Sequence, residues 1–111
     1  MILGPHTARG NIPRNIEQIV EWITGLIKYM RANNLNRIEP RREAVDAWAK
    51  HVNEAAAILL SSKISSWQTG VNRNVEGRDV LRVLSYAGSA IKYTKMANEV
   101  AEGGYKEFIL S

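Results

Sequence analysis

The sequence predicts a mainly α-helical chain with about three helices, one long irregular loop and one short strand near its C-terminal end. Apolar residues recur every three or four positions in three segments, and glycine or asparagine pairs follow two of them. Residues 61–86 show no sustained period. The 111 residues are 45% hydrophobic and 23% charged, which is typical of a folded chain with a modest core.

The first predicted helix begins near Asn15 and follows a loop over residues 1–14 that is rich in glycine and proline. Asn15 is the expected N-cap, and Gln18 lies where a capping box has an acid or amide. The Asn33–Asn34 pair is expected to end the helix. Seven apolar residues share one predicted face: Ile16, Ile19, Val20, Ile23, Leu26, Ile27 and Met30.

The second predicted helix runs from about residue 41 to residue 60, so that residues 15–60 hold two helices. Pro40 suits its first turn, because proline lacks only an N–H that has no partner there. Val45, Trp48, Val52, Ala55 and Leu59 repeat by three and four on its apolar side. We expect Trp48 to belong to the core, together with Trp22 and Tyr29 beside the apolar stripe of the first helix.

Residues 87–111 are predicted to form a terminal helix and a tail. Gly88–Ser89 opens this helix, Gly103–Gly104 ends it, and residues 105–110 form the short strand. Residues 80–84 could be a short extended piece. A 25-residue loop is unusual in so small a chain, because little is left for it to pack on. We therefore interpret the chain as part of a larger protein.

Several function classes are excluded or unsupported by composition. The chain has no cysteine, which excludes a disulfide framework and a cysteine nucleophile. His6 and His51 belong to no local metal-ligand motif, so no metal site is predicted. No apolar run approaches the roughly 20 residues that span a bilayer. The first residues do not resemble a signal peptide, and we expect a cytoplasmic protein without membrane contact.

The net charge of +4 comes from one stretch of the chain, residues 63–95, which carries six basic and two acidic residues. Such a stretch indicates a phosphate-bearing partner. Within it, Trp67 either covers the core or contacts a nucleotide, with Arg73 and Arg78 meeting phosphate. From the residues alone, a small basic helical module that binds nucleic acid and a helical piece that binds a protein partner both remain open. No catalytic residue stands out.

Short motifs run through the chain in a fixed order. They are Gly4-Pro5, Asn11-Ile12-Pro13, Asn15-Ile16-Glu17, Val20-Glu21-Trp22-Ile23, Asn53-Glu54, Ser66-Trp67, Gly70-Val71-Asn72, Asn74-Val75-Glu76-Gly77-Arg78, Tyr86-Ala87-Gly88-Ser89, Glu99-Val100-Ala101 and Gly104-Tyr105. In order and spacing they resemble the C-terminal fifth of Baeyer–Villiger flavin monooxygenases of the cyclohexanone or phenylacetone monooxygenase type. The resemblance covers nearly all 111 residues.

The resemblance implies an oxidoreductase that uses FAD and NADPH to insert oxygen next to a ketone carbonyl, giving an ester or lactone. It implies a larger α/β flavoprotein with two dinucleotide-binding domains. The glycine motifs of those domains lie upstream of the matching part, and this chain contains neither. The fragment alone is therefore expected to be inactive, to hold neither cofactor tightly, to bind no nucleic acid, and to self-associate through uncovered apolar surface.

The resemblance also assigns cofactor contacts. Trp67 falls in the mobile control loop of the family, within residues 61–86, and would hydrogen-bond to the ribose of the nicotinamide cofactor. Arg78 stands where the family often has lysine. Asn11 and Ile12 belong to the active-site loop, residues 1–14, and would approach the flavin.

A substrate pocket is implied beside the flavin. The resemblance lines it with Arg9, Gly10, Ile12 and Val83. Family members often have phenylalanine or threonine near position 9. An arginine there is a departure that leaves the substrate class open.

Overall fold

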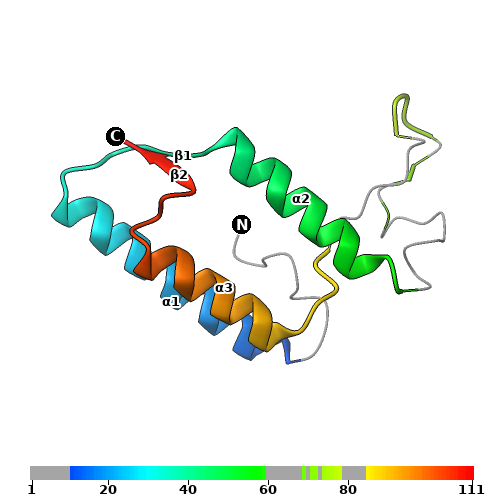
Figure 1. Ribbon diagram of the computed structural model, residues 1–111, viewed down its shortest axis with the longest axis horizontal. Coiled ribbons are helices and arrows are strands. Elements are labelled where there is room, and N and C mark those ends of the chain that lie inside the picture. Colours follow the sequence, from blue (N-terminus) through cyan, green and yellow to red (C-terminus); the bar gives the residue numbers. More distant parts are fainter. Residues whose placement is uncertain (1–10, 60–68, 70, 73, 79–84) are drawn as a thin grey trace.

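The computed structural model describes residues 11–59, 69, 71–72, 74–78 and 85–111. Along the chain these residues form α1 (Ile12–Ala32), β1 (Ile38–Pro40), α2 (Arg42–Ala56), α3 (Ala90–Glu102) and β2 (Phe108–Leu110) (Figure 1). The prediction of a mainly helical chain with three helices and a C-terminal strand is confirmed in this described part. None of its helices is long and apolar enough to cross a membrane.

The first helix begins one turn earlier than predicted, because its N-cap lies four residues before Asn15. Asn11 is its N-cap, and the Asn11 side chain accepts a hydrogen bond from the backbone N–H of Arg14 at 3.1 Å. Asn15 lies inside the helix, is only 8% exposed, and donates its own backbone N–H to the Asn11 carbonyl. The prediction of Asn15 as the cap is therefore wrong. Pro13 does not break the helix, since the first turn needs no N–H from it.

Helices α1 and α3 end in the same way. In α1, Asn34 has φ of 54° and the Leu35 N–H donates to the Met30 carbonyl. In α3, Gly104 has φ of 74° and the Tyr105 N–H donates to the Val100 carbonyl. This is the Schellman arrangement, in which a left-handed residue lets the last carbonyls find donors. The predicted ends at Asn33–Asn34 and Gly103–Gly104 are confirmed.

The predicted terminal strand pairs with a strand that the sequence did not reveal. β1 and β2 are antiparallel, with Ile38 opposite Leu110 and Pro40 opposite Phe108. Pro40 therefore belongs to β1 and not to the first turn of α2, which corrects the prediction. Arg41 is the N-cap of α2. Its backbone N–H donates to the backbone carbonyl of Glu107, and its side-chain Nε–H donates to the backbone carbonyl of Lys106. The second helix ends at Ala56, four residues before the predicted end.

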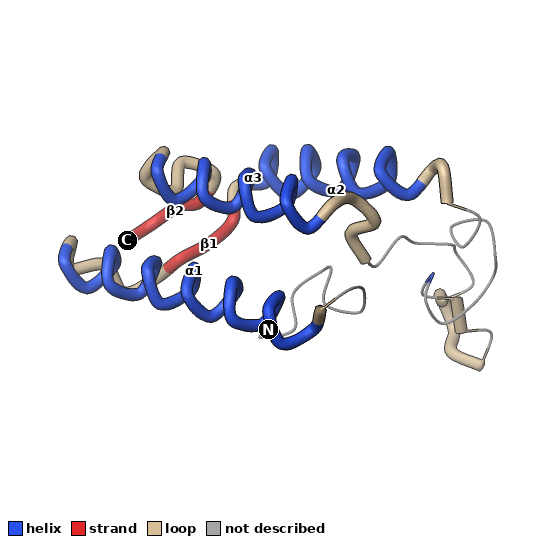
Figure 2. The backbone as a smooth tube through the Cα atoms, turned by 90° about the horizontal axis from the view of Figure 1, so that it is seen from below, coloured by secondary structure: helices blue, strands red, loops and turns tan. Residues whose placement is uncertain are grey.

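Helices α1 and α3 lie side by side, whereas α2 lies away from α1 and meets α3 through the Trp48–Tyr93 ring contact (Figures 1 and 2). The Trp22 indole N–H donates to the Ala97 carbonyl at 2.6 Å and ties α1 to α3. The Tyr105 ring packs against Trp22 and Tyr29, with centroids 5.6 and 5.1 Å away. The buried hydrophobic residues among those described are few: Ile19, Leu26, Val52, Ala56, Tyr86 and Tyr105.

The chain is more open than an independent domain. Its Cα radius of gyration is 15.8 Å, against about 13 Å for a compact domain of this length. Of the three aromatic residues expected in the core, Trp22 is partly buried, but Tyr29 and Trp48 remain 38% and 37% exposed. The prediction is therefore wrong for these two. This openness agrees with the interpretation of the chain as part of a larger protein.

Candidate functional site

Two of the predicted flavin contacts, Asn11 and Ile12, lie at the start of α1. The Asn11 side-chain oxygen caps the helix by accepting a hydrogen bond from the Arg14 N–H. Ile12, the first residue of the helix, is 45% exposed and offers an uncovered aliphatic surface. Of these two predicted flavin contacts, Ile12 is available to pack against a flat ring, and Asn11 acts on the backbone that positions it.

The segment that carries Arg78 is a closed turn. The Asn72 N–H donates to the Arg78 carbonyl at 2.7 Å, and the Arg78 N–H donates to the Val75 carbonyl at 3.2 Å. The Asn72 side chain accepts a hydrogen bond from the Asn74 N–H. Gly77 has φ of 76°, where glycine is favoured because it has no Cβ. The turn therefore fixes the backbone of Arg78 while leaving its side chain exposed.

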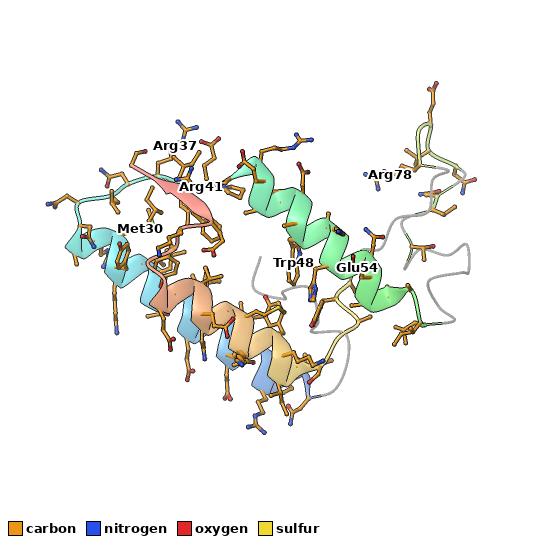
Figure 3. All side chains as sticks on the ribbon, viewed as in Figure 1. Met30, Arg37, Arg41, Trp48, Glu54 and Arg78 are labelled. Carbon is orange, nitrogen blue, oxygen red and sulfur yellow. The ribbon has the colours of Figure 1, made fainter. Side chains whose placement is uncertain are left out.

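Arg78 is available for an anionic ligand. Within the described part of the chain its guanidinium makes no ion pair, and Figure 3 shows it well away from the three helices. A guanidinium matches the geometry of a phosphate, which can accept two parallel hydrogen bonds from it. The turn and the start of α1 lie apart from each other in Figures 1 and 2, so these predicted residues do not form one cluster.

Four of the predicted site residues, Arg9, Gly10, Trp67 and Val83, lie outside the described residues, as does the segment 80–84. Their assignments stay predictions. Among the residues that the structure describes, no group of three or more histidine, cysteine, aspartate or glutamate side chains could hold a metal ion.

Sequence reasoning missed an aromatic cluster between α2 and α3. Tyr86 is 2% exposed and stacks against Trp48 and His51 of α2, with centroids 5.5 and 5.6 Å away. Tyr93 of α3 completes the cluster at 5.7 Å from Tyr86. Trp48 extends from α2 on the side that faces α3 (Figure 3). The spacing of three between Trp48 and His51 was the available signal, since such pairs share a helix face.

Burial shapes the chemistry of this cluster. The pKa of Tyr93 is raised by desolvation, so the phenol stays neutral and cannot serve as an anionic base at ordinary pH. The His51 Nε2 atom is buried without a hydrogen-bond partner among the described residues. The ring contacts of the cluster join Trp48, His51, Tyr86 and Tyr93. Its role is to hold the chain at Tyr86 against α2.

The fold places the chain among the flavin-dependent monooxygenases. A cyclohexanone monooxygenase from Rhodococcus sp. Phi1 bound to NADP⁺ matches with a TM-score of 0.84 and 33% identity, over 100% of this chain and 20% of that one. A closed cyclohexanone monooxygenase structure matches with a TM-score of 0.85 and 37% identity, over the same shares. The three helices and the short sheet therefore form one piece of that larger architecture.

The sequence relatives agree with the structures. The phenazine N-monooxygenase of Lysobacter antibioticus is 42% identical over 99% of this chain, and the acetone monooxygenase of Gordonia sp. is 40% identical over 98%. Over nearly its full length, the chain is homologous to one segment of the Baeyer–Villiger and related flavin monooxygenases. It spans about 20% of the length of these curated relatives. No family model matches the chain.

These relatives decide between the alternatives that the residues left open. All of those compared, including the cyclohexanone 1,2-monooxygenase of Acinetobacter sp., are named as monooxygenases. The alternative of a small basic module that binds nucleic acid or a protein partner has no support among them. Two of the solved relatives are described as bound to NADP.

Proposed function

We propose that this chain is the C-terminal part of an FAD- and NADPH-dependent Baeyer–Villiger monooxygenase that converts a ketone to an ester or lactone. The observation that carries the proposal is the 40–42% identity to monooxygenases over 98–99% of the chain. The flavin, bound by the rest of the polypeptide, would supply the oxygen-transferring chemistry. The fragment alone would be inactive, because the glycine loops that cradle dinucleotide phosphates are absent from it.

In this proposal the chain contributes contacts to both cofactors. Arg78 meets a phosphate of NADP, which is supported by its exposed guanidinium on a hydrogen-bonded turn. Trp67 donates its indole N–H to the ribose. Ile12 packs against the flavin, supported by its 45% exposure at the start of α1. Asn11 acts indirectly, by capping the helix that begins at Ile12.

The substrate pocket is proposed to include Arg9, Gly10, Ile12 and Val83. Two classes of substrate are considered for it. A ketone is the proposed substrate. A nitrogen heterocycle is the second candidate, because the phenazine N-monooxygenase is as similar to this chain as the acetone monooxygenase is, and Arg9 adds a cation that a purely apolar ketone pocket would not need. A cytoplasmic location is part of the same proposal.

A hybrid protein tests the proposal. This chain replaces the matching fifth of the Gordonia acetone monooxygenase, and FAD content, NADPH oxidation and products are measured with acetone, cyclohexanone and phenazine. Flavin retention with ester or lactone formation supports the proposal. Oxidation of phenazine nitrogen without ketone turnover would favour the second candidate. A folded hybrid that binds no FAD would contradict both.

The Arg78 contact is tested in the same hybrid. Arg78→Ala should raise the NADPH Michaelis constant by roughly 10- to 100-fold, the value of one charge-assisted hydrogen bond, and Arg78→Lys should recover part of it. Lys92→Ala is the matched control, because it removes one positive charge from the exposed surface of α3. If Arg78→Ala and Lys92→Ala raise the Michaelis constant equally, Arg78 contributes only its positive charge and makes no specific contact with NADP.

A further inference from the structure

The aromatic side chains that can lose an electron gather in two groups. All four tyrosines of the chain and two of its three tryptophans belong to these groups, whereas phenylalanine occurs once. In the first group the Tyr105 ring contacts Trp22 and Tyr29, with centroids 5.6 and 5.1 Å away. The second group is the cluster around Tyr86. Phenylalanine fills an apolar contact as well as tyrosine does, so packing alone does not explain the preference for oxidisable rings.

Exposure gives the first group a direction. Tyr105 is 5% exposed and Trp22 is partly buried, whereas Tyr29 is 38% exposed. At neutral pH an indolyl radical oxidises a phenol, so an oxidising equivalent, meaning one missing electron, passes from tryptophan to tyrosine. In the first group it therefore moves outward. In the second group it would move inward, because Trp48 is the member that is 37% exposed and Tyr86 is 2% exposed.

Helix α1 connects the first group to the proposed flavin contact. Ile12 is the first residue of the helix, and Trp22 lies about 15 Å further along it. Tyr29 lies about 10 Å beyond Trp22, near the C-terminal end of the helix. In the proposed function O₂ is consumed at the flavin, and turnover that fails to oxidise a substrate releases hydrogen peroxide there. The path from Trp22 to Tyr29 therefore leads away from the source of oxidant, and this step rests on the proposed function.

We propose that Trp22, Tyr105 and Tyr29 form a relay that carries one-electron oxidising equivalents from the interior to the surface and so protects the protein from its own oxidant. The oxidant is hydroxyl radical or another one-electron oxidant formed from peroxide. It removes one electron from the Trp22 indole, whose N–H proton passes to water. Tyr105 then gives up one electron and its phenolic proton, and Trp22 regains one electron and one proton.

The relay ends at the exposed phenol. Tyr29 restores Tyr105 by the same loss of one electron and one proton, and a small-molecule thiol in solution reduces the Tyr29 phenoxyl radical by giving up a hydrogen atom. Burial and, to a lesser extent, the neighbouring Tyr29 raise the pKa of Tyr105, so this phenol carries its proton at neutral pH. Each transfer through Tyr105 therefore moves a proton together with the electron.

Pulse radiolysis of the 111-residue chain tests the relay without any flavin. Azide radicals oxidise tryptophan in preference to tyrosine, and the separate visible absorptions of the indolyl and phenoxyl radicals are followed in time. A background with Trp48→Phe and Trp67→Phe leaves Trp22 as the single tryptophan. In this background Tyr105→Phe interrupts the relay and keeps the ring, and Tyr86→Phe is the matched control in the second group. Melting temperatures establish that each variant is folded.

We expect the indolyl radical to decay as the phenoxyl radical appears, at a rate that does not depend on protein concentration. Tyr105→Phe should slow this transfer by about an order of magnitude or more, because Trp22 and Tyr29 are then joined only across about 10 Å along α1. Tyr86→Phe should leave the rate unchanged. An unchanged rate in Tyr105→Phe overturns the relay, and so does a rate that rises in proportion to protein concentration.

The acetone monooxygenase hybrid tests the protective role, and it keeps all three tryptophans, so it also decides if the background variant fails to fold. The hybrid consumes NADPH and O₂ without a ketone, and peptide mass spectrometry locates the oxidised residues. We expect oxidation products at Tyr29 in the parent hybrid and a shift of these products to Trp22 in Tyr105→Phe. The same distribution in both proteins, with FAD bound and peroxide formed, overturns the protective role. A hybrid that retains no FAD contradicts the proposed function, and pulse radiolysis of the isolated chain then decides the relay by itself.

Discussion

At the scale of single residues, the close approach of a buried ring explains why residue 88 is a glycine. A Cβ built on Gly88 would overlap the Tyr86 phenol and lie 2.8 Å from its Cε1 atom. Tyr86 cannot move aside, because it is 2% exposed and stacked on both Trp48 and His51. The position therefore needs a residue without a side chain, and the aromatic cluster imposes that need.

Gly88→Ala is expected to destabilise the chain by about 1–3 kcal/mol through overpacking, measured by thermal unfolding in circular dichroism. Gly25→Ala is the matched control. Its Cβ would meet only the Tyr105 hydroxyl, at an ordinary 3.9 Å, and it lies inside α1, where alanine should add about 0.5–1 kcal/mol. If both variants gained stability, the cluster would have room that the packing does not show.

Trp67→Ala, made in the full-length hybrid, is expected to weaken the hold on NADP by about 1–2 kcal/mol, because one hydrogen bond to the ribose is lost. The NADPH Michaelis constant should rise roughly 5- to 30-fold, and more of the NADPH oxidised should end as hydrogen peroxide, since a loop that fails to close admits water. Melting temperature is measured beside this uncoupling. A stability loss of about 3–5 kcal/mol with unchanged coupling would make Trp67 a core residue.

At the scale of the elements, α1 and α3 have local signals at both ends, whereas α2 has no side-chain cap at its start. Ser89 caps α3 by accepting the Ile91 N–H, and Asn11 caps α1. The loop of residues 33–37 then leads directly into β1, so the position of α1 sets the position of the sheet. The wrong prediction of the N-cap of α1 therefore misplaced the start of the helix by one turn, but the predicted order of the helices was still correct.

Asn11→Ala should cost about 1 kcal/mol, because the Arg14 N–H loses its acceptor, and urea unfolding followed by circular dichroism is the measurement. Asn98→Ala is the control. Asn98 is exposed in the middle of α3, where alanine favours the helix, so a neutral or slightly stabilising effect is expected. If Asn11→Ala leaves the free energy of unfolding unchanged, the Asn11 side chain does not cap the helix, and Asn15 is again the candidate N-cap.

At the scale of the whole molecule, two groups of aromatic side chains connect the helices and the C-terminal tail. Tyr105 and Trp22 connect the C-terminal tail to α1, whereas Tyr86 and Tyr93 connect α2 to α3. Burial raises the pKa of Tyr93 and Tyr105, and for Tyr105 the neighbouring Tyr29 adds to the effect. Charging either phenol is therefore harder in the folded chain than in the unfolded one.

This linkage predicts alkaline destabilisation. The unfolded chain loses these protons near pH 10 while the folded chain still holds them, so stability is complete below pH 10 and falls as pH rises above it. Urea midpoints from pH 8 to pH 11 measure the fall. Tyr105→Phe should show a shallower fall than the parent chain, and the exposed lysines cancel in this comparison because both proteins carry them. Identical slopes would mean that Tyr105 ionises as freely as in the unfolded chain.

The sequence by itself determined the mainly helical class, the three helices, their glycine and asparagine ends, and the resemblance to one segment of the flavin monooxygenases. Each of these depends on residues within a few positions of one another, or on short motifs in order. The assignment of Arg78 to the cofactor comes from the resemblance and stays a prediction, and the hydrogen-bonded turn that holds its backbone is visible only in the structure.

Tertiary structure alone decided the rest. β1 is three residues long and exists only because Ile38 and Pro40 pair with Leu110 and Phe108, which are 72 and 68 positions away. The apolar stripe of α1 was visible in sequence, but only the packing of α3 decides that Ile19 and Leu26 are buried while Val20 and Ile27 remain exposed. The burial of Tyr86 against Trp48 and His51 is equally non-local. Periodicity reports that a face is apolar, and only the packing of distant segments selects what covers it.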